Sequence, residues 1–206
     1  MQVRRTQEQR SAATQQALQA AARRLWGARG YAEVGTPEIA ETAGVTRGAM
    51  YHQYADKTAL FAAVLEAVEA EVMERLQAIV VAAQPSTPAE ALRIAADAWL
   101  EIASEPDIRQ LVLLDAPNVL GWNRFREISQ RYSYGMTEQL LVAAIEAGEI
   151  RPLPVRTLGT VMLGALDEAA MCLAGAEDPV QEKANVRAVI HSLIDGLLTR
   201  PEPPPG

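Results

Sequence analysis

The fold of this chain is decided by residues 34–61, VGTPEIAETAGVTRGAMYHQYADKTALF. The pattern predicts two short helices joined by a tight turn, followed by the start of a longer helix. Thr36 is placed to cap the first helix, and Pro37 follows where a missing N–H costs nothing. Gly44 supplies the turn, because glycine accepts a left-handed backbone at little cost.

After this turn, Thr46 is expected to cap the second helix. The exposed first turn of that helix is Arg47-Gly48-Ala49, its later turns carry residues 50–54, and Asp56 caps a third helix that opens with Lys57. This order is typical of a helix-turn-helix, in which one helix braces the backbone and the next places its first residues in the major groove of DNA.

A first helix is expected just before this stretch, from about Ser11 to Ala28, because its apolar residues recur at helical spacing. Gly30 is placed to end it, and Tyr31 can fold back against it. Residues 1–10 carry three arginines and no apolar anchor, so we expect them to form a mobile arm. The three helices should share a core made of Leu18, Ala21, Leu25, Trp26, Ile39, Ala43, Val45, Met50 and Tyr54.

The rest of the chain also predicts helices, and no strand pattern competes with them. The expected helices cover about residues 57–83, 89–103, 107–115, 122–147, 155–175 and 179–199, with a turn at residues 115–118. The fold is therefore predicted to be all-α with about nine helices. We expect a helix-turn-helix domain at residues 1–60, a helical domain at 61–200 and a disordered tail at 201–206, with the boundary inside the long helix.

Composition is ordinary for a globular protein, with 49% hydrophobic and 22% charged residues among 206. The single Cys172 excludes an intrachain disulfide and suits a reducing compartment. The first residues are too polar for a signal peptide, and no apolar run approaches the ~18 residues of a membrane span. A cytoplasmic protein is expected.

Charge is distributed unevenly along the chain. The net charge is −7, which alone argues against a nucleic-acid partner. Residues 1–60, however, hold eight Lys or Arg and five Asp or Glu, a net charge of +3, so residues 61–206 carry −10. A basic end on an acidic body orients the molecule towards a polyanion.

These residues support a family resemblance over roughly the first sixty positions. The order Leu25-Trp26, Gly30-Tyr31, residues 35–40 and residues 43–54 resembles the DNA-binding domain of the TetR family of bacterial transcriptional regulators. Tyr54 stands where that family usually has phenylalanine, and Pro37 where it often has serine or threonine. The resemblance implies a homodimer, a pocket for a small molecule, and repression of a palindromic operator that is relieved when the molecule binds. No cofactor and no metal site are predicted.

The helix-turn-helix residues acquire roles from the same resemblance. Arg47 is expected to reach a guanine edge or a phosphate, and Ala49 a thymine methyl group. Phosphate contacts would set register and salt-dependent affinity. The predicted DNA-binding residues are Thr36, Pro37, Thr46, Arg47, Gly48, Ala49, Tyr51, His52 and Lys57.

A ligand pocket is expected among the central helices, although aromatic and methionine residues at helical spacing also form ordinary cores. Asp167 and Glu168 interrupt an apolar helix and could serve a cationic ligand, pair with an arginine across a dimer or face water. The ligand-binding residues predicted are Trp99, Leu113, Trp122, Phe125, Tyr132, Met136, Met162, Glu168, Met171 and Cys172, with Asp115 and Asp167 beside them.

The last two helices are expected to form the dimer interface as a four-helix bundle, because the final helix carries too many apolar residues to bury in one surface helix. Its stripe is Val186, Val189, Ile190, Leu193, Ile194, Leu197 and Leu198, and that of the helix before it is Leu158, Val161, Ala165, Leu166 and Ala169.

Two other function classes fit the sequence less well. An enzyme is disfavoured because the chain has only two histidines, one cysteine and no H-E-x-x-H or G-x-S-x-G motif. A thiol or metal sensor would have to act through Cys172 without nearby histidine ligands. No catalytic residue is therefore predicted.

Overall fold

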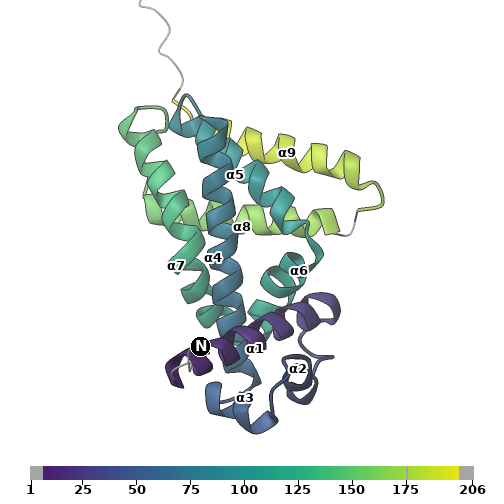
Figure 1. Cartoon of the computed structure of the whole chain (residues 1–206). Coiled ribbons are helices and arrows are strands. Elements are labelled where there is room, and N and C mark those ends of the chain that lie inside the picture. The colour runs from purple at the N-terminus through teal and green to yellow at the C-terminus, as the bar shows by residue number, and fades with distance from the viewer. Residues whose placement is uncertain (1–6, 175, 200–206) are drawn as a thin grey trace, which may run out of the picture. The chain divides into compact units, whose positions relative to one another are not determined.

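The computed structural model describes residues 7–174 and 176–199, and every element named within these ranges is a helix (Figure 1). The all-α prediction is confirmed. None of the helices in the described part of the chain combines the length and apolar character that a membrane-spanning segment needs.

The chain divides into two compact units that alternate along the sequence. Unit 1 holds residues 1–69 and 105–128, and unit 2 holds residues 70–104 and 129–206. The long helices α4 (Lys57–Ala83) and α7 (Ala116–Glu146) each belong partly to both units. The predicted functional boundary at residue 60 stays a prediction, and the predicted tail at 201–206 lies outside the described residues.

Unit 1 is built on α1 (Gln7–Arg29), α2 (Thr36–Thr42), α3 (Arg47–Gln53) and the first half of α4 (Figure 1). Its core is formed by side chains with no exposed surface: Leu18, Trp26, Val34, Ile39, Met50, Leu60 and Phe61. The rings of Trp26, Tyr31 and Phe61 pack with centroids 5.2–5.4 Å apart, so Tyr31 folds back on α1 as predicted.

Two expectations about this unit were wrong. Residues 7–10 are the first turn of α1 and not part of an arm, since Gln, Glu and Arg are good helix formers; residues 1–6 of the predicted arm lie outside the described residues. Leu25, Ala43 and Val45 are half-buried rather than buried.

The second segment of unit 1 departs from regular α-helix. It begins with α6 (Pro106–Ile108), continues as the π-helix η1 (Arg109–Asp115) and runs directly into α7. The predicted turn at 115–118 is therefore wrong, because Pro117 is accepted in the first turn of α7, where it costs little. The interruption falls instead at Gly121, whose φ of 73° and ψ of 157° suit glycine alone.

Unit 2 contains α5 (Pro88–Ala103), α8 (Val155–Ala174), α9 (Pro179–Asp195) and the second halves of α4 and α7. Helices α8 and α9 pack against each other and both contact α5 (Figure 1). One core cluster joins Leu92, Leu141, Ala144 and Ile150. Helix α7 ends before Gly148, whose φ is 72°, as the sequence predicts.

Helix α9 is shorter than predicted and uses its apolar residues in two ways. It ends at Asp195, and Leu197 and Leu198 lie beyond it, packed against the Leu92 cluster. Val186, Ile190 and Ile194 are buried within the chain, whereas Val189 and Leu193 are exposed. The expected dimer stripe was therefore too broad, because most of its members complete the core of unit 2.

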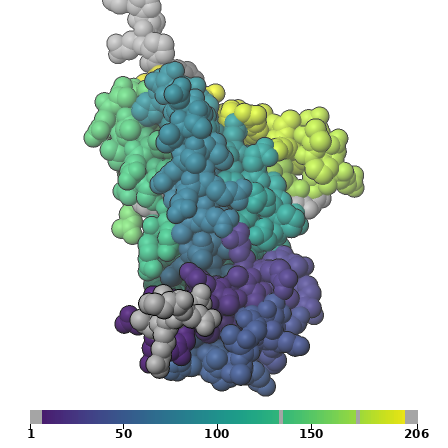
Figure 2. All heavy atoms as spheres, viewed as in Figure 1, coloured from purple at the N-terminus to yellow at the C-terminus, as the bar shows by residue number. Residues whose placement is uncertain are grey.

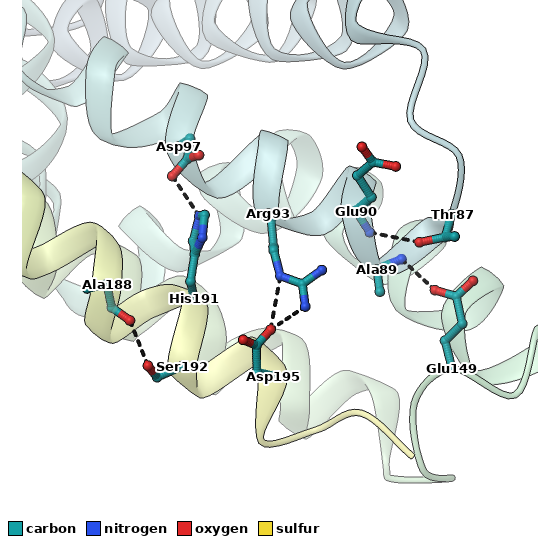
Figure 3. A network of polar contacts seen from close by, with 10 residues as sticks. All are labelled: Thr87, Ala89, Glu90, Arg93, Asp97, Glu149, Ala188, His191, Ser192 and Asp195. Atoms are coloured by element: carbon teal, nitrogen blue, oxygen red, sulfur yellow. Dashed lines mark hydrogen bonds and ion pairs between the residues drawn. The ribbon is translucent and has the colours of Figure 1, made fainter. Parts of the chain in front are cut away.

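Polar side chains join α5 to α9 in an antiparallel ladder with a spacing of four residues on each helix (Figure 3). Arg93 pairs with Asp195, with Nε donating to Oδ1 at 3.0 Å, and Asp97 faces His191 Nε2 at 2.9 Å. Arg187 pairs with Asp97, and Lys183 with Glu101. These pairs are partly exposed, so they fix the register of the two helices more than they stabilise the fold.

Candidate nucleic-acid interface

Helix α3 offers its first turn to solvent. Thr46 caps it, because its Oγ1 accepts the Ala49 N–H at 3.1 Å, as predicted. Arg47 and Gly48 are exposed, and Ala49 is half-buried. An exposed arginine followed by two small residues leaves room for another molecule to approach the backbone closely.

The opposite end of α3 is anchored to α1. Met50 is completely buried, and the Tyr54 hydroxyl accepts a hydrogen bond from Gln19 Nε2 at 2.8 Å. Ser11 Oγ donates to Gln53 Oε1 at 3.0 Å. Because these contacts hold the C-terminal end of the helix, its N-terminal end is displayed in a fixed orientation.

Helix α2 is capped differently from the prediction. Gly35 occupies the cap position without a side-chain hydrogen bond, so Thr36 lies in the first turn and does not cap the helix. Its hydroxyl instead lies 3.1 Å from the Tyr51 hydroxyl and is buried. Pro37 is exposed beside it, in the first turn where it needs no N–H partner.

Tyr51 connects α2 and α3 electrostatically. The hydrogen bond with Thr36 lowers the pKa of the Tyr51 phenol, burial opposes that change, and the nearby Arg47 side chain lowers it further. The phenol remains 46% exposed, and His52 beside it is also exposed. The structure thus pairs Thr36 of α2 with Tyr51 of α3, places Arg47 near the Tyr51 phenol and leaves His52 exposed on the same helix.

Lys57 has an intrachain role that the sequence did not reveal. Its Nζ donates to the Tyr31 carbonyl oxygen at 2.6 Å and lies 3.9 Å from the centre of the Tyr31 ring. Burial lowers the pKa of Lys57, and the carboxylate of Asp115 partly restores it. Asp56 caps α4 as predicted, with Oδ1 accepting the Ala59 N–H at 2.7 Å.

The predicted ligand-binding residues are divided between the two units. Leu113, Trp122 and Phe125 lie in unit 1, where Phe125 is buried, Trp122 is 59% exposed and their rings are 5.9 Å apart. The other predicted residues lie in unit 2: Trp99, Tyr132, Met136, Met162 and Met171 are half-buried, whereas Glu168 and Cys172 are exposed. Their role in binding stays a prediction.

One hollow in unit 2 brings two of these residues together. Met171 and Cys172 line a space of about 580 Å³ at the turn between α8 and α9, together with Asp178 and Glu182. Asp178 Oδ1 already accepts the Val180 and Gln181 N–H groups as the cap of α9. Among the described residues, no group of three or more His, Cys, Asp or Glu is arranged to hold a metal ion.

Comparison with known sequences agrees with this geometry. A family model described as bacterial regulatory proteins, tetR family, matches residues 18–64, and a model described as the tetracyclin repressor-like C-terminal domain matches residues 89–197. The second model alone covers more than half of the chain. This chain belongs to the TetR family.

Three known proteins resemble the chain over nearly its whole length. A TetR-family transcriptional regulator from Pectobacterium atrosepticum is 35% identical, over 96% of this chain and 100% of that one, with a TM-score of 0.78. The Transposon Tn10 TetC protein of Escherichia coli is 22% identical over 93% of this chain and 95% of its own length. RolR, solved in complex with resorcinol, is 20% identical over 96% of this chain and 98% of that one, and its TM-score of 0.73 shows a shared fold. The chain is thus a TetR-family transcriptional regulator with a helix-turn-helix.

Proposed function

We propose that this TetR-family regulator is a dimeric repressor that binds a palindromic operator and leaves it when a small molecule binds. The observation that carries the proposal is the first turn of α3, exposed at its N-terminal end and anchored to α1 at the other. A helix held in this way can enter the major groove without reorganising the protein.

In this proposal Arg47 reads a base, because an exposed guanidinium at the start of α3 can donate two hydrogen bonds to guanine O6 and N7. Ala49 contacts a thymine methyl group, and Gly48 allows the close approach. Contacts to phosphates come from the surrounding side chains and supply salt-dependent affinity without sequence choice. These side chains are Thr36, Thr46, Tyr51, His52 and Lys57, with Pro37 against the sugar-phosphate backbone.

Hydrogen bonds within the chain limit the phosphate contacts that Thr36, Tyr51 and Lys57 can make. The Thr36 and Tyr51 hydroxyls share one hydrogen bond in which either can be the donor, so only one of their two protons is left for a phosphate. Because Tyr51 is exposed and Thr36 is buried, that contact is assigned to the Tyr51 phenol. One N–H of the Lys57 ammonium group donates to the Tyr31 carbonyl oxygen. Two N–H groups remain for other acceptors, since an ammonium carries three donors. Lys57 is therefore assigned a phosphate contact through at most two N–H donors.

A second copy of the chain is proposed to cover the exposed side of α8 and α9. Val161, Val189 and Leu193 expose 63%, 59% and 55% of their surface on these two neighbouring helices. Helix α9 lies at the surface of unit 2, where it is coloured yellow-green to yellow in Figure 2. Pairing them with the same two helices of a symmetry mate would give a four-helix bundle.

The ligand is proposed to be a small molecule held in unit 2. Trp99, Tyr132, Met136 and Met162 are half-buried there and offer aromatic and polarizable surface. RolR, which shares the fold, was solved with resorcinol, a small aromatic molecule. Binding would release DNA by changing the separation of the two α3 helices, because half-sites must lie about 34–36 Å apart, or a multiple of that distance, to be bound together.

Mobility shifts with duplex fragments of the DNA around the gene for this protein test the proposal. The wild type should retard at least one fragment, and Arg47→Ala should weaken binding by about five- to 150-fold, the equivalent of about 1–3 kcal/mol. Arg156→Ala, which removes an exposed arginine of α8, is the matched control and should leave affinity within about twofold. Failure of the wild type to retard any fragment at low salt would contradict the repressor.

A further inference from the structure

Two carboxylates from the second segment of unit 1 reach back to α1 and the turn after it. Asp107 Oδ2 pairs with Arg23 Nη2 at 3.2 Å, and Asp115 Oδ2 accepts the Tyr31 backbone N–H at 2.8 Å. The partners in each pair are 84 residues apart, so the two contacts repeat with a spacing of eight residues along both segments.

The π-helical winding of η1 explains how Asp115 reaches this position. Eight residues of α-helix would turn a side chain about 80° away from the first, since 3.6 residues make one turn. The i→i+5 winding of η1 turns less per residue and brings Asp115 back towards the face that carries Asp107. The reach of Asp115 therefore depends on the winding of residues 109–115.

The backbone of Tyr31 is bound at both of its polar groups, which belong to two successive peptide planes. Its N–H is bound by Asp115, and its carbonyl oxygen by Lys57 Nζ at 2.6 Å. Its ring packs against both Trp26 and Phe61, which also contact each other, and its hydroxyl lies 3.1 Å from Thr58 Oγ1.

The Tyr31 N–H takes its acceptor from a side chain, because the backbone before it leaves the helix. Gly30 has a φ of 83° and donates its own N–H to Trp26 O at 2.7 Å, which ends α1. The Tyr31 N–H points past the helix and has the Asp115 carboxylate as its acceptor. An acceptor in the second segment therefore binds the backbone N–H that follows the end of α1.

We propose that Asp115 is a positioning residue for DNA binding, which fixes the Tyr31 peptide and thereby the orientation of α2 and α3. This inference rests on the proposed function. A change of η1 from π to α winding would carry the carboxylate away from the Tyr31 N–H. A rearrangement of residues 109–115 would in this way change the orientation of α2 and α3.

Three full-length variants distinguish the effect of the Asp115 hydrogen-bond acceptor from the effect of its negative charge. Asp115→Ala removes both, whereas Asp115→Asn keeps a carbonyl oxygen for the Tyr31 N–H and loses the charge beside Lys57. Asp107→Ala is the matched control, because it removes a carboxylate of the same segment whose ion pair with Arg23 is partly exposed.

Amide hydrogen exchange and operator titration are then measured on each variant. In Asp115→Ala the Tyr31 amide should exchange at least about tenfold faster, while the Gly30 amide, bonded to Trp26 O, should keep its rate. The same variant should bind operator about tenfold more weakly with an unchanged salt slope, because the phosphate contacts remain. Asp115→Asn should restore both values to within about threefold of the wild type, and Asp107→Ala should change neither.

Two outcomes would overturn this proposal: an unchanged Tyr31 exchange rate in Asp115→Ala, or faster exchange with unchanged operator affinity. A variant that also exchanges rapidly at Gly30 has lost the end of α1, and the Asp115→Asn result then decides. Failure of the wild type to bind any DNA would contradict both the proposed repressor function and the proposed role of Asp115. By contrast, normal wild-type binding that Asp115→Ala leaves intact removes only the role of Asp115.

Discussion

Charged residues on the exposed face of α9 should separate the proposed dimer. The double change Val189→Glu and Leu193→Glu places two carboxylates where two apolar side chains are 59% and 55% exposed in the single chain. Neither residue belongs to the core of unit 2, which uses Val186, Ile190 and Ile194 of the same helix. The variant should therefore fold normally while its self-association fails.

The size of the effect follows from the exposed fractions. Complete burial of a valine or leucine contributes about 1.5–3 kcal/mol, so covering the remaining half of each contributes roughly 1 kcal/mol. Two side chains occur twice in a symmetric dimer, which gives roughly 4 kcal/mol before any charge repulsion is counted. Since about 1.4 kcal/mol is a factor of ten, the dissociation constant of the dimer should rise by about a thousandfold.

Sedimentation equilibrium over a range of protein concentrations measures this change. The control is Val81→Glu, which puts the same charge on a valine that is 75% exposed near the end of α4. Circular dichroism should show the same helicity in all three proteins. If the double variant dimerised as tightly as the wild type, the assignment of the α8–α9 face would be refuted.

Three further changes test individual contacts of the DNA-binding helices. Thr36→Val removes the hydrogen bond that favours the Tyr51 phenolate, so the pKa of Tyr51 should rise towards its ordinary value of about 10; ultraviolet titration of the phenol measures it, and an unmoved pKa would contradict the pairing. Met50→Ala empties a completely buried position and should lower the free energy of unfolding by about 2–5 kcal/mol in urea denaturation, a loss below about 1 kcal/mol being inconsistent with that burial. Thr46→Ala removes the α3 cap and should cost about 1 kcal/mol in the same assay, whereas an equally stable variant would mean that the cap contributes nothing.

Much of unit 1 could be predicted because its decisive contacts are local in sequence. The caps of Thr46 and Asp56 bind N–H groups three residues away, and Gly30 and Gly44 take the left-handed backbone that their positions require. A short-range pattern determines such contacts, so the sequence reveals them. Thr36 failed as a cap because Gly35 can serve as one without a side chain, and the hydroxyl found the Tyr51 phenol instead.

The contacts of Asp115 could not be predicted in this way. Its partner Tyr31 lies 84 residues away, and its direction depends on a π-helical winding that leaves no period of its own in the sequence. The ladder between α5 and α9 did carry a signal, since charged residues recur every four positions on both helices. That spacing also describes an ordinary solvated helix, so only the packing of the two helices distinguishes the cases.

The apolar residues of α9 show a second limit of prediction from the sequence. The sequence indicates that this helix is unusually apolar, but helical periodicity alone cannot say which side faces the core of its own chain and which side faces a partner. The structure assigns Ile190 and Ile194 to the core and leaves Val189 and Leu193 exposed. Leu197 and Leu198 leave the helix altogether, because Gly196 ends it.

The central claim is that the exposed end of α3 lies in the major groove twice per dimer, and methylation interference at guanine N7 tests it most directly, since N7 is read only in that groove. The account predicts that methylated guanines block binding in two symmetric half-sites separated by about 34–36 Å or a multiple of it. It also predicts that Arg47→Ala loses one such guanine in each half-site. Interference confined to a single site, or a pattern that Arg47→Ala leaves unchanged, would contradict the account.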